Sequence, residues 1–207
     1  MSNQTNSYLV GYNCGISIEI ESFPISQRSL RYQQQENPSL SLGDQVIYAV
    51  AQVLPKFPEF NSYFSGEVTK YPSINIAYSI NLGKGPKKVV LKNADKLSLV
   101  EVSYAVKAFA FKYMRENLTE ADTEGATTSI LNLSFFNPYS VVTPLFADQA
   151  ALLTIASERE IVKIVQEKAV AQKVFNLCLA YDVRVADCQR ALQFLNAIKD
   201  ILEKKEA

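Results

Sequence analysis

The sequence of 207 residues contains no histidine. Histidine is the side chain whose ordinary pKa lies closest to neutral pH, so proton transfer in this protein has to use another group. Only three cysteines are present, Cys14, Cys178 and Cys188, and their spacing matches no metal site. Their odd number argues against a disulfide framework. The sequence therefore predicts no bound metal and a reducing compartment.

Net charge and long apolar runs are also absent. Basic and acidic residues balance at 21 each, which leaves no global field that would attract nucleic acid or an acidic membrane. No run of about 18 apolar residues that would span a membrane occurs. The start, M-S-N-Q-T-N-S, has neither the basic residues nor the apolar run of a signal peptide. We expect a cytoplasmic protein that binds neither nucleic acid nor membrane.

The composition that remains is typical of a globular domain, with 48% apolar and 20% charged residues. Residues 1–7 are polar and predict a disordered tail. Residues 8–207 show no internal repeat and no linker, and they predict a single α/β domain.

Residue periodicity places the elements of that domain. Alternation of apolar and polar residues predicts strands at 16–20 and 74–82, and short segments beside turns or loops predict strands at 88–91, 127–133 and 151–156. Helical periodicity predicts one helix capped by Ser41 or Asp44 and another capped by Asp95 or Ser98. Residues 33–38 predict a polar loop, and 160–170 fit either a strand or a turn. Two strands and a helix are predicted to close the chain.

The stretch from residue 173 to 195 is the most informative part of the chain. Its first half alternates as a buried strand does, and a polar turn from Tyr181 to Arg184 follows. An amphipathic helix comes next, with an apolar face predicted to consist of Leu192, Leu195, Ile198 and Leu202. A strand that leads through a polar turn into a helix holds reactive groups rigidly.

This stretch carries a resemblance to a known family. The chain reads Tyr-Asp-Val-Arg-Val-Ala-Asp-Cys from residue 181 and Gln-Phe-Leu from residue 193. It resembles the C-terminal signature of the acyltransferase component of 2-oxo-acid dehydrogenase complexes, roughly Phe-Asp-His-Arg-Val-x-Asp-Gly followed by Arg-Phe-Leu. Patches at residues 58–62, 93–99, 132–133 and 143–144 are also similar, in the same order. The resemblance implies a chloramphenicol acetyltransferase-like fold, a two-layer α/β sandwich with a mixed sheet.

The departures from the family pattern concern its chemistry. In the family, a histidine deprotonates the thiol of coenzyme A or dihydrolipoamide, and a serine donates a hydrogen bond to the oxyanion. Here Val183 stands at the histidine and Leu131 at the serine. Losing a positioned base costs roughly 10²–10⁴-fold in rate, and losing an oxyanion donor roughly 10²–10³-fold. The resemblance therefore implies that the usual acyl transfer is lost.

The polar residues that remain in the turn allow two interpretations. Asp182 and Arg184 match family residues that mainly stabilise the turn, and Asp187 matches an aspartate that supports the site. As an alternative, Tyr181, Asp182, Asp187 or Cys188 acts as acid, base or nucleophile in different chemistry. Cys188 as a nucleophile needs its thiolate stabilised by the helix start or a nearby arginine; otherwise it is a small packing residue.

Two further groups of residues have open interpretations. Aromatic residues after Leu131 either line an apolar ligand pocket or fill a subunit interface: Phe135, Phe136, Tyr139 and Phe146. The lysines at 84, 87, 88 and 92 either meet the phosphates of coenzyme A or form a solvated hairpin.

The resemblance favours a catalytically inactive relative of the acyltransferase core over an enzyme. Family members form trimers with the active site between adjacent subunits, so we expect a homotrimeric scaffold or a module that binds an acyl thioester or a partner. A higher assembly, or assembly with an active homologue, is also compatible. Coenzyme A or a lipoyl thioester is the ligand that the resemblance implies. The alternative is a divergent enzyme that uses the channel between subunits on a coenzyme A or carrier-protein thioester.

Overall fold

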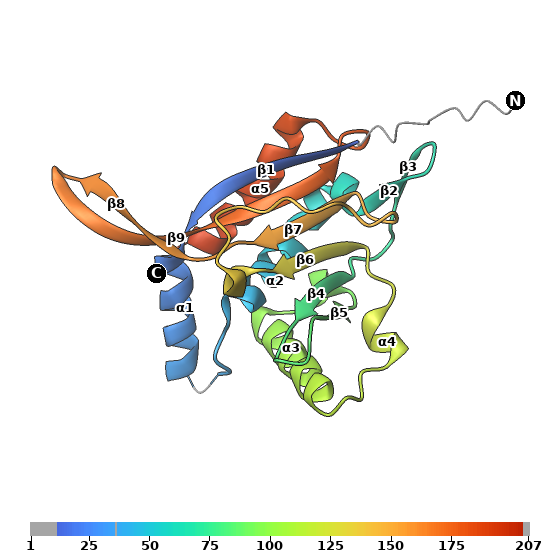
Figure 1. Ribbon diagram of the computed structural model, residues 1–207, viewed down its shortest axis with the longest axis horizontal. Coiled ribbons are helices and arrows are strands. Elements are labelled where there is room, and N and C mark those ends of the chain that lie inside the picture. Colours follow the sequence, from blue (N-terminus) through green and yellow to red (C-terminus); the bar gives the residue numbers. More distant parts are fainter. Residues whose placement is uncertain (1–11, 36, 205–207) are drawn as a thin grey trace, which may run out of the picture.

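The computed structural model describes residues 12–35 and 37–204, in which a mixed sheet carries helices on one face (Figure 1). The predicted tail at residues 1–7 and the predicted start of the domain at residue 8 lie outside the described residues. The fold is mixed α/β, as predicted. The sheet and its helix layer position every candidate site residue.

The described sheet has seven strands, in the order β1-β9-β7-β6-β4-β5, with β8 paired to β9. The β4–β6 and β6–β7 pairs are parallel and the other pairs antiparallel, so the sheet is mixed. A separate hairpin pairs β2 with β3. The strands are β1 (Asn13–Glu21), β2 (Ser62–Phe64), β3 (Val68–Lys70), β4 (Ile76–Ile80), β5 (Lys87–Leu91), β6 (Thr128–Asn132), β7 (Ala151–Ile155), β8 (Arg159–Val165) and β9 (Lys168–Asp182).

The helices lie beside the sheet, and the second and the last of them bury apolar faces in its core. They are α1 (Ser22–Gln34), α2 (Leu42–Val53), α3 (Leu99–Met114), the single turn α4 (Glu120–Thr123) and α5 (Cys188–Glu203). Ser41 and Ser98 each start a helix with a capping box, in which the serine hydroxyl accepts from a backbone N–H one turn on. Of the two caps proposed for each helix, the serine is therefore correct in both. Buried members of α2 and α5 join the sheet in one core.

Three predictions about elements were wrong. The helix α1 was not predicted, because it buries few apolar residues and its helical period is hard to recognise. It includes Gln33 and Gln34, which were predicted to lie in a loop. A single strand of 15 residues, β9, replaces the two predicted strands before the last helix. The apolar face predicted for α5 was wrong at one of its four residues: Leu195, Ile198 and Leu202 are fully buried, but Leu192 is 39% exposed and Phe194 is buried instead.

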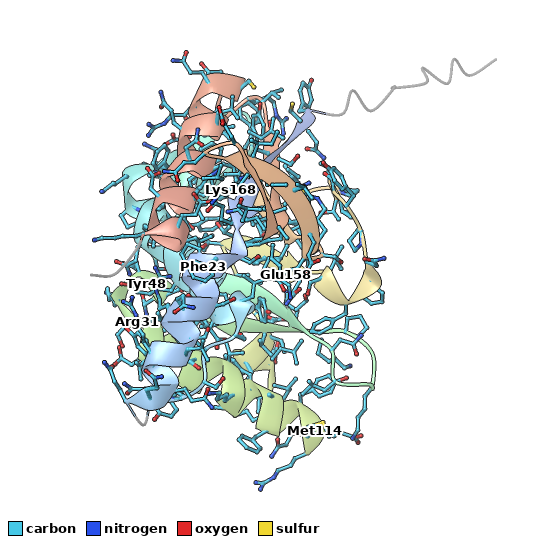
Figure 2. All side chains as sticks on the ribbon, turned by 90° about the vertical axis from the view of Figure 1, so that its left-hand side faces the viewer. Phe23, Arg31, Tyr48, Met114, Glu158 and Lys168 are labelled. Atoms are coloured by element: carbon cyan, nitrogen blue, oxygen red, sulfur yellow. The ribbon has the colours of Figure 1, made fainter. Side chains whose placement is uncertain are left out.

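Residues 159–173 form an arm that projects beyond the sheet (Figure 1). Ile155 pairs with Leu177 and Arg159 with Val174, so β8 continues β7 along the same edge of β9 after an interruption. One face of the arm contacts β1 through an ion pair of Lys163 with Glu21 at 3.2 Å. In Figure 2 the arm points toward the viewer, with Lys168 at its tip.

The other face of the arm is apolar and uncovered by any described residue. Val162 is 72% exposed and Ile164 is 80% exposed, and both project from the same face of β8. Isolated two-stranded ribbons are marginally stable in water, so an arm of this shape gains stability when its apolar face is covered.

Candidate functional site

The turn after β9 is held by backbone hydrogen bonds to two neighbouring segments. Asp182 ends β9, and its N–H donates to the carbonyl of Ala150 at 3.0 Å. The N–H of Val183 donates to the carbonyl of Tyr12 at 2.9 Å. Val183 is 48% exposed. The residue that the resemblance aligns with the family histidine is thus partly open to solvent in a single chain.

A charged pair lies inside this turn. The guanidinium of Arg184 donates to both carboxylate oxygens of Asp182, and the Arg184 N–H donates to Oδ1 at 2.9 Å. The rings of Tyr12 and Phe64 each lie 4.2 Å from the guanidinium carbon. Burial raises the pKa of the Asp182 carboxyl, but the hydrogen bonds from Arg184 lower it more, so it lies below its ordinary value. Asp182 is therefore an ionised partner of Arg184 and a poor proton acceptor.

The remaining candidates in the turn have separate surroundings. Asp187 is the N-cap of α5, where its carboxylate accepts from the Arg190 N–H at 2.7 Å. Tyr181 is buried, and its hydroxyl lies within hydrogen-bonding reach of the thiols of Cys14 and Cys188. Burial, followed by these thiols, raises the pKa of Tyr181, so its hydroxyl stays protonated. Cys188 is exposed at the first position of α5 and is no core packing residue.

Leu131 lies elsewhere, in a cavity of about 950 Å³ where the parallel strands β4 and β6 end. The start of α2, with Gly43, forms one wall, and Phe135 and Phe136 form another. Clefts outside the carboxyl ends of parallel strands are common ligand sites, and this volume falls within their usual range. Phe135 and Phe136 line this cavity, which favours the interpretation of the aromatic residues as the lining of an apolar ligand pocket. Phe146 lines a smaller neighbouring hollow.

A chain of hydrogen bonds lies in the wall of this cavity. The N–H and hydroxyl of Ser134 donate to the side-chain oxygen of Asn132 at 3.1 and 2.7 Å. The amide nitrogen of Asn132 then donates to the hydroxyl of Tyr78 at 3.0 Å. The backbone N–H of Asn132 donates to the hydroxyl of Ser79 at 3.1 Å. The cavity is thus mainly apolar with a few fixed polar groups.

Leu131 and Val183, the two positions that the resemblance predicts for the family site, do not meet within one chain. Leu131 pairs with Thr154, which pairs with Cys178. Val183 follows Cys178 by five residues, which is about 17 Å along an extended strand. One chain therefore contributes the Leu131 side and the Val183 side at opposite ends of the strands.

Three residues that line the cavity were not predicted from the sequence: Tyr78, Gly43 and Glu158. Alternation placed Tyr78 on a strand, but which strand and helix lie beside it depends on the pairing of distant segments. Glu158, labelled in Figure 2, is an exposed carboxylate immediately before the arm. Among the lysines of residues 84–92, Lys84 pairs with Glu116 at 2.6 Å and Lys92 donates to the carbonyl of Glu124.

The described residues contain no cluster of aspartate, glutamate or cysteine that would hold a metal ion. No helix among the same residues is both long enough and apolar enough to cross a bilayer.

The mixed sheet and the helix layer on one face define a fold of the chloramphenicol acetyltransferase class. A solved chloramphenicol acetyltransferase has the same fold, with a TM-score of 0.63 at 15% identity, over 93% of this chain and 89% of that one. More narrowly, this chain belongs to the 2-oxoacid dehydrogenases acyltransferase (catalytic domain) family, whose model matches residues 18–207. The family predicted from the C-terminal turn is confirmed.

Two relatives show how far the likeness extends. The succinyltransferase component of the 2-oxoglutarate dehydrogenase complex of Haemophilus influenzae is 28% identical over 174 residues, which are 84% of this chain and 42% of that protein. The crystal structure of a probable dihydrolipoamide acetyltransferase from Listeria monocytogenes has a TM-score of 0.86 at 28% identity, over 94% of this chain and 85% of that one. This chain thus spans about two fifths of the curated relative.

Proposed function

We propose that this chain is a non-catalytic acyltransferase core that binds an acyl thioester in the Leu131 cavity and assembles as a homotrimer. The observation that carries the proposal is the retained cavity, with an apolar leucine at the position of the family's oxyanion donor. A leucine side chain offers no hydrogen bond to an oxyanion but packs well against an acyl chain.

The separation of Leu131 and Val183 supports the homotrimer. Because the two positions lie at opposite ends of the strands, a site that uses both needs two chains. A cyclic arrangement in which each chain presents one end to its neighbour satisfies this need for every copy. The exposed apolar face of the arm is a second surface that such contacts would cover. An active homologue in place of a second copy, or a larger assembly of trimers, is compatible with the same surfaces.

The thioester of coenzyme A or of a lipoyl group is the ligand class we assign to the cavity. The wall formed by Phe135, Phe136 and Leu131 suits an acyl chain, and the polar groups on β4 and β6 suit its carbonyl. Both thioesters carry the same acyl carbonyl, so the cavity does not by itself discriminate between them.

Loss of catalysis is supported by the surroundings of the substitute candidates. Asp182 is paired with Arg184, Asp187 caps α5, and the Tyr181 hydroxyl is buried with a raised pKa. The two carboxylates are thus engaged in an ion pair and a helix cap, and the tyrosine hydroxyl stays protonated, whereas the family's mechanism uses a histidine as its base.

The test compares the unmodified chain with the double variant Leu131→Ser and Val183→His. Acyl transfer from acetyl coenzyme A to dihydrolipoamide is measured beside the mass of the assembly. We expect a trimer without turnover above the uncatalysed rate, and turnover in the double variant. Each single variant serves as a matched control and should stay near background, because each restores one of the two groups. Robust turnover by the unmodified chain would contradict the proposal.

A divergent enzyme is the second candidate, and the exposed thiol of Cys188 is the observation that favours it. Cys188 is the first residue of a helix of 16 residues, and its thiol is exposed to an incoming thioester. This candidate predicts turnover on a thioester panel that Cys188→Ser abolishes and Cys14→Ser leaves intact. Turnover that persists in Cys188→Ser would exclude the thiol.

A further inference from the structure

Tyr78 lies in the wall of the Leu131 cavity and belongs to none of the sequence patches that carry the family resemblance. It lies in the middle of β4, 7% exposed, with its ring turned toward α2. A Cβ atom on residue 43 would lie 2.1 Å from the Tyr78 hydroxyl, so only a glycine lets the hydroxyl take this position. Gly43, Asn132 and Tyr78 all line the cavity. The hydroxyl is therefore placed among groups that a bound ligand would contact.

The hydrogen bonds around Tyr78 fix which way its hydroxyl can donate. Ser134 donates twice to the side-chain oxygen of Asn132, so the Asn132 amide must present its nitrogen to Tyr78. Tyr78 accepts from that nitrogen at 3.0 Å, and an amide nitrogen cannot accept a hydrogen bond in return. Among the described residues, none accepts a hydrogen bond from the Tyr78 hydroxyl. The tyrosine keeps one donor for a ligand.

The surroundings also keep this donor neutral. Burial raises the pKa of the Tyr78 hydroxyl, the hydrogen bond from Asn132 opposes this, and the charge of Asp44 raises it further, so the net pKa lies above its ordinary value. A buried hydroxyl that stays protonated and lacks an acceptor is costly until a ligand oxygen satisfies it.

We propose that the Tyr78 hydroxyl donates a hydrogen bond to the acyl carbonyl oxygen of a thioester in the cavity and so selects carbonyl-bearing ligands. This inference rests on the proposed thioester binding and assigns its specificity to one atom. Tyr78 acts in binding, so it requires no proton transfer and no catalytic turnover. A site with a donor in place rejects an analogue that lacks the matching acceptor.

The experiment measures the affinity of the full chain for two ligands that differ only in the carbonyl. S-acetyl-dihydrolipoamide carries the carbonyl, and S-ethyl-dihydrolipoamide replaces it with a methylene group. Titration calorimetry is run on the unmodified chain, on Tyr78→Phe and on Tyr104→Phe. Tyr104 is 57% exposed on α3 and does not line the cavity, so Tyr104→Phe removes the same atom from a site without a role.

We expect the unmodified chain to bind the thioester about three- to tenfold more tightly than the thioether, which corresponds to one neutral hydrogen bond. Tyr78→Phe should lose this preference by weakening thioester binding alone, while Tyr104→Phe keeps it. Absence of the preference in the unmodified chain would already overturn the role of Tyr78, so the inference can be refuted even if Tyr78→Phe is unstable.

The outcomes separate this inference from the proposed function. Equal affinity of the unmodified chain for both ligands would leave thioester binding intact and overturn the role of Tyr78. A Tyr78→Phe variant that retains the full preference, or that loses both ligands equally, would also overturn it. Binding of neither ligand to the unmodified chain would overturn the proposed function and the inference together.

Discussion

In the turn after β9, the surroundings explain why Asp182 and Arg184 are charged residues, but they do not explain why residue 183 is a valine. Asp182 and Arg184 form an ion pair beside the rings of Tyr12 and Phe64, whereas Val183 between them is 48% exposed and its N–H donates to the carbonyl of Tyr12. That the ion pair stabilises the turn stays a prediction, and its pH dependence provides the test.

Replacing Asp182 with asparagine should lower the melting temperature at neutral pH. The folded-state pKa of Asp182 lies below its ordinary value of 3.8, so its contribution is fully present above about pH 4 and disappears as the pH falls through the folded value. The gap in melting temperature between the unmodified chain and Asp182→Asn should therefore close below pH 4. Thermal unfolding followed by circular dichroism measures it. Asp200→Asn on the exposed face of α5 is the control and should run parallel to the unmodified chain. A gap that stays constant down to pH 2 would contradict the role of the ion pair.

Replacing Gly43 with alanine should destabilise the chain through Tyr78. The new Cβ would lie 2.1 Å from the hydroxyl oxygen and 2.8 Å from the ring carbon that carries it. Overpacking of this kind costs about 1–3 kcal/mol in the free energy of unfolding. Urea unfolding should show that Gly43→Ala is partly rescued by Tyr78→Phe, since the nearest atom is then gone. The same cycle with Tyr104→Phe should show no rescue. Strict additivity with Tyr78→Phe would place the strain elsewhere.

At the level of elements, the sequence predicted what is local. Alternation identified β1 and β4, short segments beside turns or loops identified β5, β6 and β7, and the serine caps of α2 and α3 follow from hydrogen bonds within one helical turn. The helix α1 escaped prediction because its buried face includes Arg28, which donates to Gln45 and to carbonyls at the end of α5. Partners so distant in sequence leave no periodic pattern.

The arm contains a local strain that a new turn should relieve. Its two-residue loop places Gln166 at φ 47° and Glu167 at φ 62°, a conformation that asparagine and glycine adopt far more readily. Replacing the pair with Asn-Gly should raise the free energy of unfolding by about 1–2 kcal/mol. Chemical denaturation measures the change. Gln166→Ala, which keeps a Cβ at the strained position, should bring no gain, and an equal gain there would point to a different cause.

At the level of the whole molecule, the family predicted from the sequence is confirmed, whereas the assignment of Leu131 and Val183 to the altered positions of its site stays a prediction. Of the cavity, the sequence indicated only the aromatic residues, as one of two interpretations. The contribution of Tyr78 and Gly43 required the pairing of β4 with β6 and the packing of α2 on β4, which join residues separated by more than thirty positions. Long-range pairing is where a single sequence carries least information.

The apolar face of the arm provides a test of assembly. Replacing both Val162 and Ile164 with lysine should reduce the mass in solution from a trimer to a monomer, since charges would be buried without partners. The stability of the dilute chain should change by less than about 0.5 kcal/mol, because both residues are exposed in a single copy. Light scattering measures the mass. Phe111→Lys, at a side chain of α3 that is 68% exposed, is the matched control and should remain a trimer. A trimer that survives the double lysine change would exclude this face as the contact.

The distance between Leu131 and Val183 has a consequence for assemblies that mix this chain with active relatives. In a closed ring of three, each copy would supply the Leu131 side of one site and the Val183 side of the next. One copy of this chain inserted among active relatives would therefore disable two sites, one for want of a serine and the other for want of a histidine. Activity of the mixed ring would fall with the square of the active fraction. Without any effector or covalent change, the ratio of expression between two related chains would then set the output of the assembly.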